Sequence, residues 1–359
     1  MQSEKRKFLY KVVYDGLKKD ILEGKYKSGD LLPSENQIAD EYTVDRTTVR
    51  KALQLLVEEK LVEKRPGKGS VVTGQGYEME CKPSGKGMAI GFLLPRGNSI
   101  TKAFYALLFY EAEKECQKHG CTLVYSTLDD EDNLDEIVSS HKLSGAIFVS
   151  NVAERHLDRA IQISLPSVLA NGMNEKMPSI VSDNFNGAYQ VTRYLLEMGH
   201  RRIAVITGIT SYYANQERYR GFSYAMMEAG VPIREEYIIS TPSWEMESGV
   251  EATRKLLESC SQRPTAIFGF NDRLAVGAVQ AIQQEGMRVP DDISVVGYDN
   301  LDQAKYSVPR ITTIESHVPL LAKTAVVSLF QQIEGGERLP VRIQTPVELV
   351  VCDSVKKLI

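Results

Sequence analysis

From residue 88 onward the sequence alternates short apolar runs with amphipathic helical stretches, and this alternation constrains the fold more than any other feature. Helical patterns occupy, for example, residues 188–198 and 273–285. Repeated β-α units favour a parallel, doubly wound sheet with helices on both faces, and about 270 residues suffice for two such lobes. The strand candidates are residues 89–94, 122–125, 146–149, 167–169, 202–206, 266–270 and 294–296.

The first 73 residues show a different pattern, in which three helical segments precede a hairpin. Apolar residues at helical spacing predict the first helix: Val13, Leu17 and Ile21. Ser34 and Gln37 have the spacing of a capping box and predict the start of a second, short helix. Asp45 is a favourable N-cap for a third helix, whose predicted inner stripe is Val49, Ala52, Leu53, Leu56 and Val57.

A hairpin is predicted after the third helix. Two short apolar pieces, residues 61–63 and 70–72, flank a basic, glycine-rich segment. Three helices and a basic hairpin make a winged helix-turn-helix, mostly α with a β-hairpin wing. We therefore expect an α/β protein overall, with a DNA-binding domain at 1–73, a Gly-, Ser-, Lys- and Pro-containing linker at 74–87, and an effector-binding and dimerisation domain at 88–359.

The charge distribution agrees with that division. The net charge of −4 alone argues against a nucleic-acid partner. However, residues 1–87 contain 17 Lys/Arg against 14 Asp/Glu, whereas the rest of the chain contains 26 against 33. A mildly basic head on an acidic body fits a head that meets DNA phosphates, and chance variation in surface charge is the alternative.

Cysteine usage and hydropathy bear on location and cofactors. Five cysteines form no C-x-x-C pair, and five histidines are scattered without an H-x-x-x-H motif. Neither a metal site nor a disulfide framework follows, so we expect a reducing, cytoplasmic setting and no cofactor. The basic N-terminus lacks an apolar signal-peptide core, and no run of about 18 apolar residues occurs, so no membrane association is expected.

The chemistry for DNA reading is concentrated at the start of the third helix, in residues 46–51. Arginine presents a fork that matches O6 and N7 of guanine, and threonine hydroxyls reach phosphates. A recognition helix reads bases with its N-terminal residues, and its N-terminus adds partial positive charge. In the hairpin tip, Gly67 and Gly69 let the backbone approach a groove while Lys68 reaches into it. A solvated basic helix face is the alternative reading.

The string LPSENQIADEYTVDRTTVRKALQLLVEEKLVEKRPGKGSVV resembles the N-terminal domain of GntR-family repressors, and the resemblance covers residues 8–73. That family has a proline-Ser/Ala-Glu start, an R-x-T-[VIL]-R recognition helix and a G-x-G wing. The resemblance implies DNA contacts from the recognition helix and the wing, although Asn36 stands where the family often has arginine. The candidate DNA-binding residues are Ser34, Glu35, Asn36, Arg46, Thr47, Thr48, Arg50, Lys51, Gly67, Lys68 and Gly69.

Distinctive side chains follow several predicted strands, where doubly wound sheets bind ligands. Carboxylates, an arginine and an asparagine offer bidentate hydrogen bonds to neighbouring hydroxyls. A tryptophan in a polar loop can stack on the apolar face of a sugar ring. A capping or packing role is the alternative for each residue taken singly. The candidate effector-binding residues are Phe104, Tyr105, Asp183, Asn186, Arg218, Trp244, Asn271 and Asp299.

Residues 88–352 resemble the effector domain of LacI/GalR-family repressors, as in the strings VSDNFNGAYQVTRYLLEMGHRRIAVITG and PTAIFGFNDRLAVGAVQAIQQEGMRVPDDISVVGYDN. The resemblance implies a two-lobed, periplasmic-binding-protein-like parallel α/β domain. It also implies that Arg218, Asn271 and Asp299 hydrogen-bond the ligand and that Trp244 stacks on it. By the same resemblance, Asn186 and the Phe104–Tyr105 pair would complete the pocket.

A GntR-type head replaces the usual LacI head with its hinge helix, and this combination resembles the L-arabinose repressors. We therefore expect a homodimeric repressor that binds double-stranded operator DNA and is released by a small sugar, with L-arabinose the first candidate. Another pentose or hexose, or a nucleobase-like corepressor, is the alternative. An exported sugar-binding protein is disfavoured by the head, and a glycosidase by the lack of a nucleophile motif, phosphate loop or metal cluster.

Overall fold

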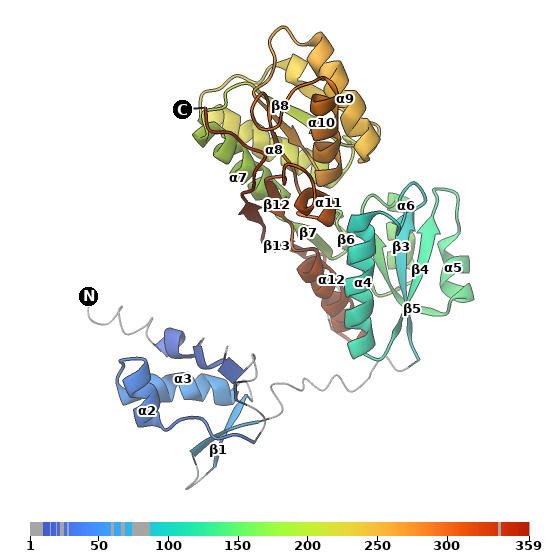
Figure 1. Ribbon diagram of the computed structural model, residues 1–359. Coiled ribbons are helices and arrows are strands. Elements are labelled where there is room, and N and C mark those ends of the chain that lie inside the picture. Colours follow the sequence, from blue (N-terminus) through green and yellow to red (C-terminus); the bar gives the residue numbers. More distant parts are fainter. Residues whose placement is uncertain are drawn as a thin grey trace. The chain divides into compact units, whose positions relative to one another are not determined.

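The computed structural model divides the chain into two compact units, Met1–Ser84 and Gly85–Ile359, and each is described by itself (Figure 1). Within the described residues, no helix is long and apolar enough to cross a membrane, and no group of three or more His, Cys, Asp or Glu side chains could hold a metal ion. The described residues are 10–14, 16–18, 20–21, 25–26, 29–58, 61–65, 69–73, 87–336 and 339–358.

Capping side chains fix the starts of two helices in the N-terminal unit. Helix α2 (Glu35–Glu41) begins after Ser34, whose Oγ accepts the N–H of Gln37 at 3.4 Å, while Gln37 Oε1 accepts the N–H of Ser34 at 2.8 Å. The predicted capping box is therefore confirmed. Helix α3 (Arg46–Glu58) begins after Asp45, whose carboxylate accepts the backbone N–H three residues on at 2.8 Å.

One apolar core holds this unit together. A helical segment over residues 10–14, 16–18 and 20–21 packs with α2, α3 and the hairpin. Strand β1 (Val62–Arg65) pairs antiparallel with β2 (Gly69–Val72), and the hairpin tip lies outside the described residues. The predicted winged helix-turn-helix is confirmed. The buried residues include Val13, Leu17, Ile21, Ile38, Val49, Ala52, Leu53 and Leu56, with Val57 half-buried.

The first lobe of the C-terminal unit is a six-stranded parallel sheet in the order β13-β7-β6-β5-β3-β4. Helices α4 (Ala103–Lys118) and α12 (Val318–Ile333) cover one face, and α5 (Leu134–Ser140) and α6 (Glu154–Gln162) cover the other. The strands are β3 (Ala89–Pro95), β4 (Thr122–Leu128), β5 (Leu143–Val149), β6 (Ser167–Ala170), β7 (Ser179–Ser182) and β13 (Arg342–Thr345).

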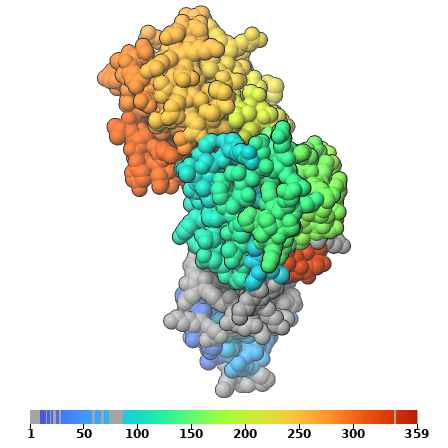
Figure 2. All heavy atoms as spheres, turned by 90° about the vertical axis from the view of Figure 1, so that its right-hand side faces the viewer, coloured from blue at the N-terminus to red at the C-terminus, as the bar shows by residue number. Residues whose placement is uncertain are grey.

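The second lobe is a four-stranded parallel sheet in the order β11-β10-β8-β9. Helices α7 (Asn184–Glu197) and α8 (Tyr213–Glu228) cover one face, and α9 (Met246–Ser259) and α10 (Asp272–Gln284) cover the other. Figure 2 shows the two lobes as distinct masses, cyan to green and yellow to orange. The predicted two-lobed, doubly wound α/β fold is therefore confirmed. The strands are β8 (Ile203–Thr207), β9 (Ile238–Ser240), β10 (Ala266–Gly269) and β11 (Ser294–Val296). The lobe also contains two short helices, η2 (Glu235–Tyr237) and α11 (Asp302–Lys305).

The chain crosses between the lobes three times. It leaves the first lobe after β7, returns between β12 (Thr313–Glu315) and α12, and leaves again between β13 and β14 (Glu348–Val350), which pairs antiparallel with β12. Hydrogen bonds join these crossings, because the N–H of Asp183 donates to the carbonyl of Thr345 at 3.0 Å and the Ser182 hydroxyl donates to the carbonyl of Ser316 at 3.2 Å. The first lobe is therefore built from two separate stretches of chain.

Five short strands are not among those predicted from the sequence. The predicted strands coincide with β3 to β6, β8, β10 and β11, whereas β7, β9, β12, β13 and β14 are only three or four residues long. The predicted strands β6, β10 and β11 are equally short but wholly buried, whereas β9, β13 and β14 are partly exposed and lack a continuous apolar run. Pairing with neighbouring strands, which the local sequence does not encode, defines these elements.

Candidate DNA-binding surface and effector pocket

Two arginines at the start of α3 are exposed basic side chains of the predicted recognition helix. The side chains of Arg46 and Arg50 are 58% and 57% exposed, and both reach the carboxylate of Glu35 on α2. Arg50 Nε lies 2.8 Å and Arg46 Nη2 lies 3.5 Å from Glu35 Oε2. The hydrogen bond from Arg50 lowers the pKa of Glu35 below its usual value. Exposed pairs contribute about 0–1 kcal/mol, so both arginines can exchange Glu35 for another acceptor at little cost.

The other predicted contact residues of α3 are engaged within the N-terminal unit. The buried Thr48 donates its hydroxyl to Asp45 Oδ1 at 3.1 Å, and the hydroxyl of Thr47 donates to the same oxygen. The ammonium of Lys51 lies 4.2 Å from the ring centroid of Tyr10. The two threonines therefore help to build the start of the helix, while Lys51 contacts the first helical segment, and the DNA contacts of all three stay a prediction.

The remaining predicted DNA-binding residues lie at the start of α2 and in the wing. Ser34 is held in the capping box, and Asn36 is exposed on α2. Gly69 opens β2 with a φ of 107°, a left-handed conformation that favours glycine. Gly67 and Lys68 lie outside the described residues.

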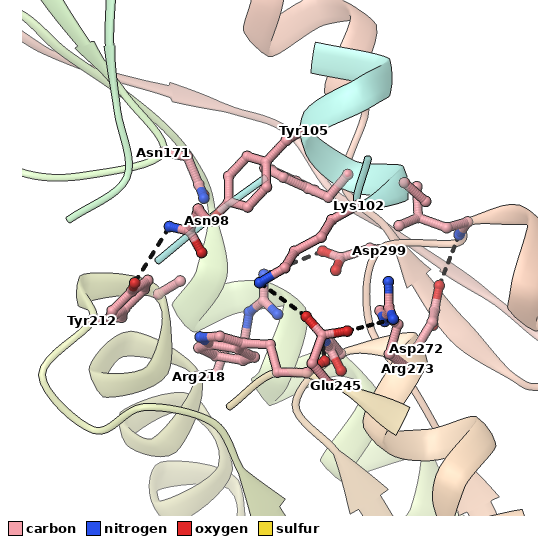
Figure 3. A pocket seen from close by; sticks show the side chains of 16 residues that line it. Asn98, Lys102, Tyr105, Asn171, Tyr212, Arg218, Glu245, Asp272, Arg273 and Asp299 are labelled. Atoms are coloured by element: carbon pink, nitrogen blue, oxygen red, sulfur yellow. Dashed lines mark hydrogen bonds and ion pairs between the residues drawn. The ribbon is translucent and has the colours of Figure 1, made fainter. Parts of the chain in front are cut away.

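A pocket lies between the two lobes of the C-terminal unit and encloses about 660 Å³, part of it open to solvent (Figure 3). Its lining residues from the second lobe follow β8, β9, β10 and β11, at the carboxyl ends of the parallel strands, where such sheets bind ligands. Residues at the start of α4, after β3, line it from the first lobe. Six of the eight predicted effector-binding residues are among its lining: Phe104, Tyr105, Arg218, Trp244, Asn271 and Asp299.

Arg218 is fixed at the wall of this pocket by contacts around its whole guanidinium group. The residue is only 5% exposed. Its Nε donates to Asn184 Oδ1 at 2.8 Å, its Nη1 donates to the carbonyl of Phe270, and its Nη2 donates to Asp299 Oδ1 at 3.3 Å. The guanidinium carbon also lies 3.6 Å from the ring centroid of Tyr298. Arg218 therefore presents a positive charge that the surrounding side chains hold in one position.

Two buried carboxylates lie beside this arginine. Burial raises the pKa of Asp299 to about 6, although the charge of Arg218 acts in the opposite direction. Asp272 is fully buried and accepts hydrogen bonds from the N–H of Leu301 at 2.7 Å and from the hydroxyl of Thr313. Burial, with the nearby charge of Asp299, raises the pKa of Asp272 well above its usual value. Asp272 is therefore held by hydrogen bonds within the fold, and Asp299 is the ionised partner of Arg218 at neutral pH.

Trp244, the one tryptophan of the chain, forms an apolar part of the pocket wall. Its ring packs directly on Gly208, where a Cβ atom would lie 2.4 Å from the indole. Asn271 Oδ1 accepts the N–H of Leu274 at 2.8 Å and caps α10, while Nδ2 donates to the carbonyl of Trp244 at 3.0 Å. Asn271 therefore anchors the tryptophan loop, and its direct contact with a ligand stays a prediction.

Asp183 and Asn186 are not among the lining residues of this pocket. Asp183 caps α7, where its Oδ1 accepts the N–H of Asn186 at 3.3 Å. The backbone of Asp183 also lies at the first crossing between the lobes, where it bonds to β13. The structure thus places both residues at the junction of the lobes.

Several polar lining residues were not predicted. Lys102 and Glu245 directly precede α4 and α9, and Arg273 is the second residue of α10. Tyr212 precedes α8, and its hydroxyl accepts a hydrogen bond from Asn98 Nδ2 at 3.4 Å, which joins the lobes. All follow strand ends, which is the signal that could have found them. However, polar residues at helix starts are equally explained as caps. Their proximity across the cleft depends on contacts between residues that are far apart in the sequence.

A winged helix with exposed arginines on its recognition helix, on one chain with a two-lobed unit of this kind, defines a transcriptional regulator. Sequence comparison agrees with both parts. The profile of the family described as bacterial regulatory proteins, gntR family, matches residues 9–72, and that of the periplasmic binding protein-like domain matches residues 192–355.

Individual relatives extend the match over both lobes. The HTH-type transcriptional repressor PurR of Photobacterium profundum is 33% identical over 279 residues, which cover 75% of this chain and 81% of that relative. The ribose operon repressor of Haemophilus influenzae is 33% identical over 254 residues, covering 68% and 74%. A crystal structure of a LacI family transcriptional regulator from Enterococcus faecium with bound ribose is 25% identical, with a TM-score of 0.68, and covers 76% of this chain and 100% of that one.

The chain belongs to the LacI/GalR family of transcriptional repressors, with a DNA-binding domain of the gntR family in place of the usual head. It is a DNA-binding transcriptional repressor, and its relatives are transcriptional regulators and not enzymes.

Proposed function

We propose that this repressor leaves its operator when a small sugar binds between the lobes, and that L-arabinose is the first sugar to test. The observation that carries the proposal is the pocket itself, in which Arg218, Asp299 and Trp244 meet at the strand ends of the second lobe and face α4 of the first. A carboxylate and a guanidinium suit neighbouring hydroxyls, and an indole suits the apolar face of a sugar ring. The ribose bound by the Enterococcus faecium regulator and the resemblance to L-arabinose repressors support this choice.

On the DNA side, Arg46 and Arg50 would read bases, because their guanidinium groups are exposed at the start of the recognition helix. Lys68 in the wing would contact phosphate. One recognition helix covers only a half-site, so we propose a homodimer on a pseudo-palindromic operator. Sedimentation on operator DNA should give two chains per site, and a tight complex of one chain with a single half-site would contradict this.

Sugar and operator binding would be coupled through the arrangement of the two lobes. A sugar that contacts both lobes favours one arrangement of the cleft, and that arrangement would hold the DNA-binding domains differently. A ligand shifts operator binding only by its difference in affinity for the two states, and operator DNA must weaken sugar binding by the same factor. Within this scheme, the domain of residues 1–73 binds DNA, the domain of residues 88–359 binds the effector, and the linker of residues 74–87 connects them.

The test is operator affinity with and without saturating sugar, in wild type and in Asp299→Ala. Wild type should release the operator when the sugar is added. Asp299→Ala should bind operator as wild type does and fail to release it, because the pocket loses an acceptor while the DNA surface is unchanged. An Asp299→Ala protein that still responds at the same sugar concentrations as wild type would show that the pocket assignment is wrong.

A planar, nucleobase-like corepressor is the second candidate, and the aromatic lining of the pocket favours it. Four aromatic rings line the cavity: Phe104, Tyr105, Tyr212 and Trp244. Such a ligand would stack between rings and would increase operator affinity. The same titration separates the two candidates, because the sign of the change in operator affinity is opposite.

A further inference from the structure

Three charged residues outside the predicted site form a group at the wall of the pocket. Lys102 Nζ, from the first lobe, lies 3.0 Å from Glu245 Oε1, in the second lobe. The guanidinium of Arg273 pairs with the other oxygen of the same carboxylate. Figure 3 shows the two cations on either side of Glu245. One carboxylate is therefore shared by two cations that come from different lobes.

The charges of the pocket lining do not balance once burial is considered. The lining contains the cations Lys102, Arg218 and Arg273 and the acids Glu245, Asp272 and Asp299. Asp299 neutralises Arg218 at 3.3 Å. Asp272 is fully buried, and its two oxygens are engaged inside the fold by the N–H of Leu301 and the hydroxyl of Thr313. Lys102 and Arg273 therefore share one carboxylate, that of Glu245.

Hydrogen-bond donors are also in excess at this place. Among the described residues of this wall, Trp244 Nε1, Arg273 Nε and Glu245 Oε1 are buried without a hydrogen-bond partner, and the first two are donors. The indole and guanidinium nitrogens carry hydrogen and can only donate, so two unpartnered donors stand against one unpartnered acceptor. Buried donors without acceptors are unfavourable, so a ligand that supplies acceptor oxygens gains more here than one that supplies donors. A carboxylate or phosphate supplies these acceptors together with a negative charge, and its geometry matches the guanidinium fork.

We propose that the effector is an acidic sugar derivative whose anionic group binds Lys102 and Arg273 in place of the Glu245 carboxylate. This inference rests on the proposed function and narrows its ligand class from sugars in general to sugars that bear a carboxylate or a phosphate. The side chain of Glu245 is 22% exposed although its Oε1 is buried, so the carboxylate has a path toward solvent when the ligand anion replaces it. Because Lys102 lies in the first lobe and Arg273 in the second, the anion would also join the lobes, as Glu245 does in this structure.

The experiment uses the full chain and the fluorescence of Trp244, which reports on the pocket alone because the chain has no other tryptophan. L-Arabinose is compared with L-arabinonate, and D-ribose with D-ribose 5-phosphate, so that each neutral sugar has an acidic counterpart and the two pairs separate carboxylate from phosphate. Inorganic phosphate alone is the third arm. The acidic member of at least one pair should bind about tenfold tighter or more than its neutral partner, which is the effect of one charge-assisted contact.

Removing a cation and removing the competing carboxylate should change the affinity for the acid in opposite directions. Lys102→Gln and Arg273→Gln should each lower the affinity for the acidic member and bring the ratio of acid affinity to neutral-sugar affinity close to one. Glu245→Gln should increase affinity for the acid, because it removes the competing carboxylate. Arg288→Gln, which alters an arginine whose side chain is 74% exposed in the same lobe and outside the pocket lining, should behave as wild type.

The proposal is overturned if the neutral sugar binds as tightly as its acid in both pairs, if no member binds, or if Glu245→Gln weakens the acid. Inorganic phosphate binding as tightly as the sugar acid would also overturn it, since a general anion site would then explain the data. A neutral sugar that releases the operator would leave the proposed function standing without this inference. Absence of operator binding would remove the proposed function, while the tryptophan titration would still report on the anion site.

Discussion

Arg50 of the recognition helix and Arg218 of the pocket both donate to carboxylates, but their surroundings differ. The side chain of Arg50 is 57% exposed and meets Glu35, whereas that of Arg218 is 6% exposed and meets Asp299 together with a carbonyl and an amide oxygen. An exposed pair contributes about 0–1 kcal/mol, whereas removing one partner of a buried pair costs about 3–5 kcal/mol. The DNA-binding arginine can therefore change partners, and the pocket arginine is part of the folded structure.

The largest effect expected from this contrast is on stability. Arg218→Ala should lower the free energy of unfolding of the C-terminal unit by about 3–5 kcal/mol, because it leaves the buried Asp299 without its cation. Urea unfolding followed by Trp244 fluorescence measures this. Arg193→Ala, which breaks an exposed pair with Glu197 on α7, is the control and should cost less than about 1 kcal/mol. Equal effects of the two substitutions would contradict the contrast.

A smaller effect is expected for operator binding. Arg46→Ala and Arg50→Ala should each weaken operator binding by about 1–3 kcal/mol and relax selectivity at one base pair. Both should change stability by no more than about 0.5 kcal/mol, as for other surface substitutions. Fluorescence anisotropy with a series of single-base operator variants measures the first effect, and Lys25→Ala provides an exposed control in the same unit. Unchanged operator affinity in both arginine variants would remove the recognition-helix assignment.

The pH dependence of effector binding sharpens the description of the buried pair. Burial raises the pKa of Asp299 to about 6, so the carboxylate gains a proton as the pH falls through that value. If the ionised form accepts the ligand hydroxyls, affinity should fall about tenfold, or about 1.4 kcal/mol, between pH 7 and pH 5. The raised pKa also affects stability. The contribution of Asp299 to the free energy of unfolding is greatest below about pH 4, where the carboxyl is protonated in both states, and it is lost as the pH rises through about 6.

Asp299→Asn is the matched variant for that measurement. It cannot ionise, so both the effector titration and the unfolding free energy should lose the part of their pH dependence that falls between about pH 4 and pH 7. Operator binding in the absence of ligand should keep its wild-type pH dependence. If Asp299→Asn keeps the wild-type dependence of effector affinity on pH, that dependence belongs to another titratable group.

The smallest expected effect concerns the wing. Lys68→Ala should weaken binding to all DNA sequences alike and reduce the slope of log affinity against log salt concentration by about 0.9, the value for one lost phosphate contact. Titrations at several salt concentrations with operator and unrelated DNA measure this. A loss of selectivity at one base pair, with the salt slope unchanged, would instead assign Lys68 to base reading.

The parts of the structure that depend on neighbouring residues in the sequence were predictable, and those that depend on distant ones were not. The capping box of Ser34 and Gln37 involves residues three apart, so their identities are sufficient to place the start of α2. Asp183 follows a strand as pocket residues do, but that strand ends at a crossing between the lobes, and so the residue caps α7 there. The group of Lys102, Glu245 and Arg273 comes from three helix starts in two lobes, and no local pattern encodes their meeting.

The discontinuous first lobe has a consequence for how the protein is made. Helix α12 packs against α4, β5, β6 and β7, and it buries Val326, Leu329 and Phe330 in the core of that lobe. Because the ribosome releases the chain from its N-terminus, this lobe must wait for residues beyond 317, by which time the strands and helices of the second lobe have already emerged. A premature stop codon near residue 312 would therefore leave the earlier-translated lobe without α12, and it would also remove Ser354, which bonds to Val295 at the edge of the second sheet.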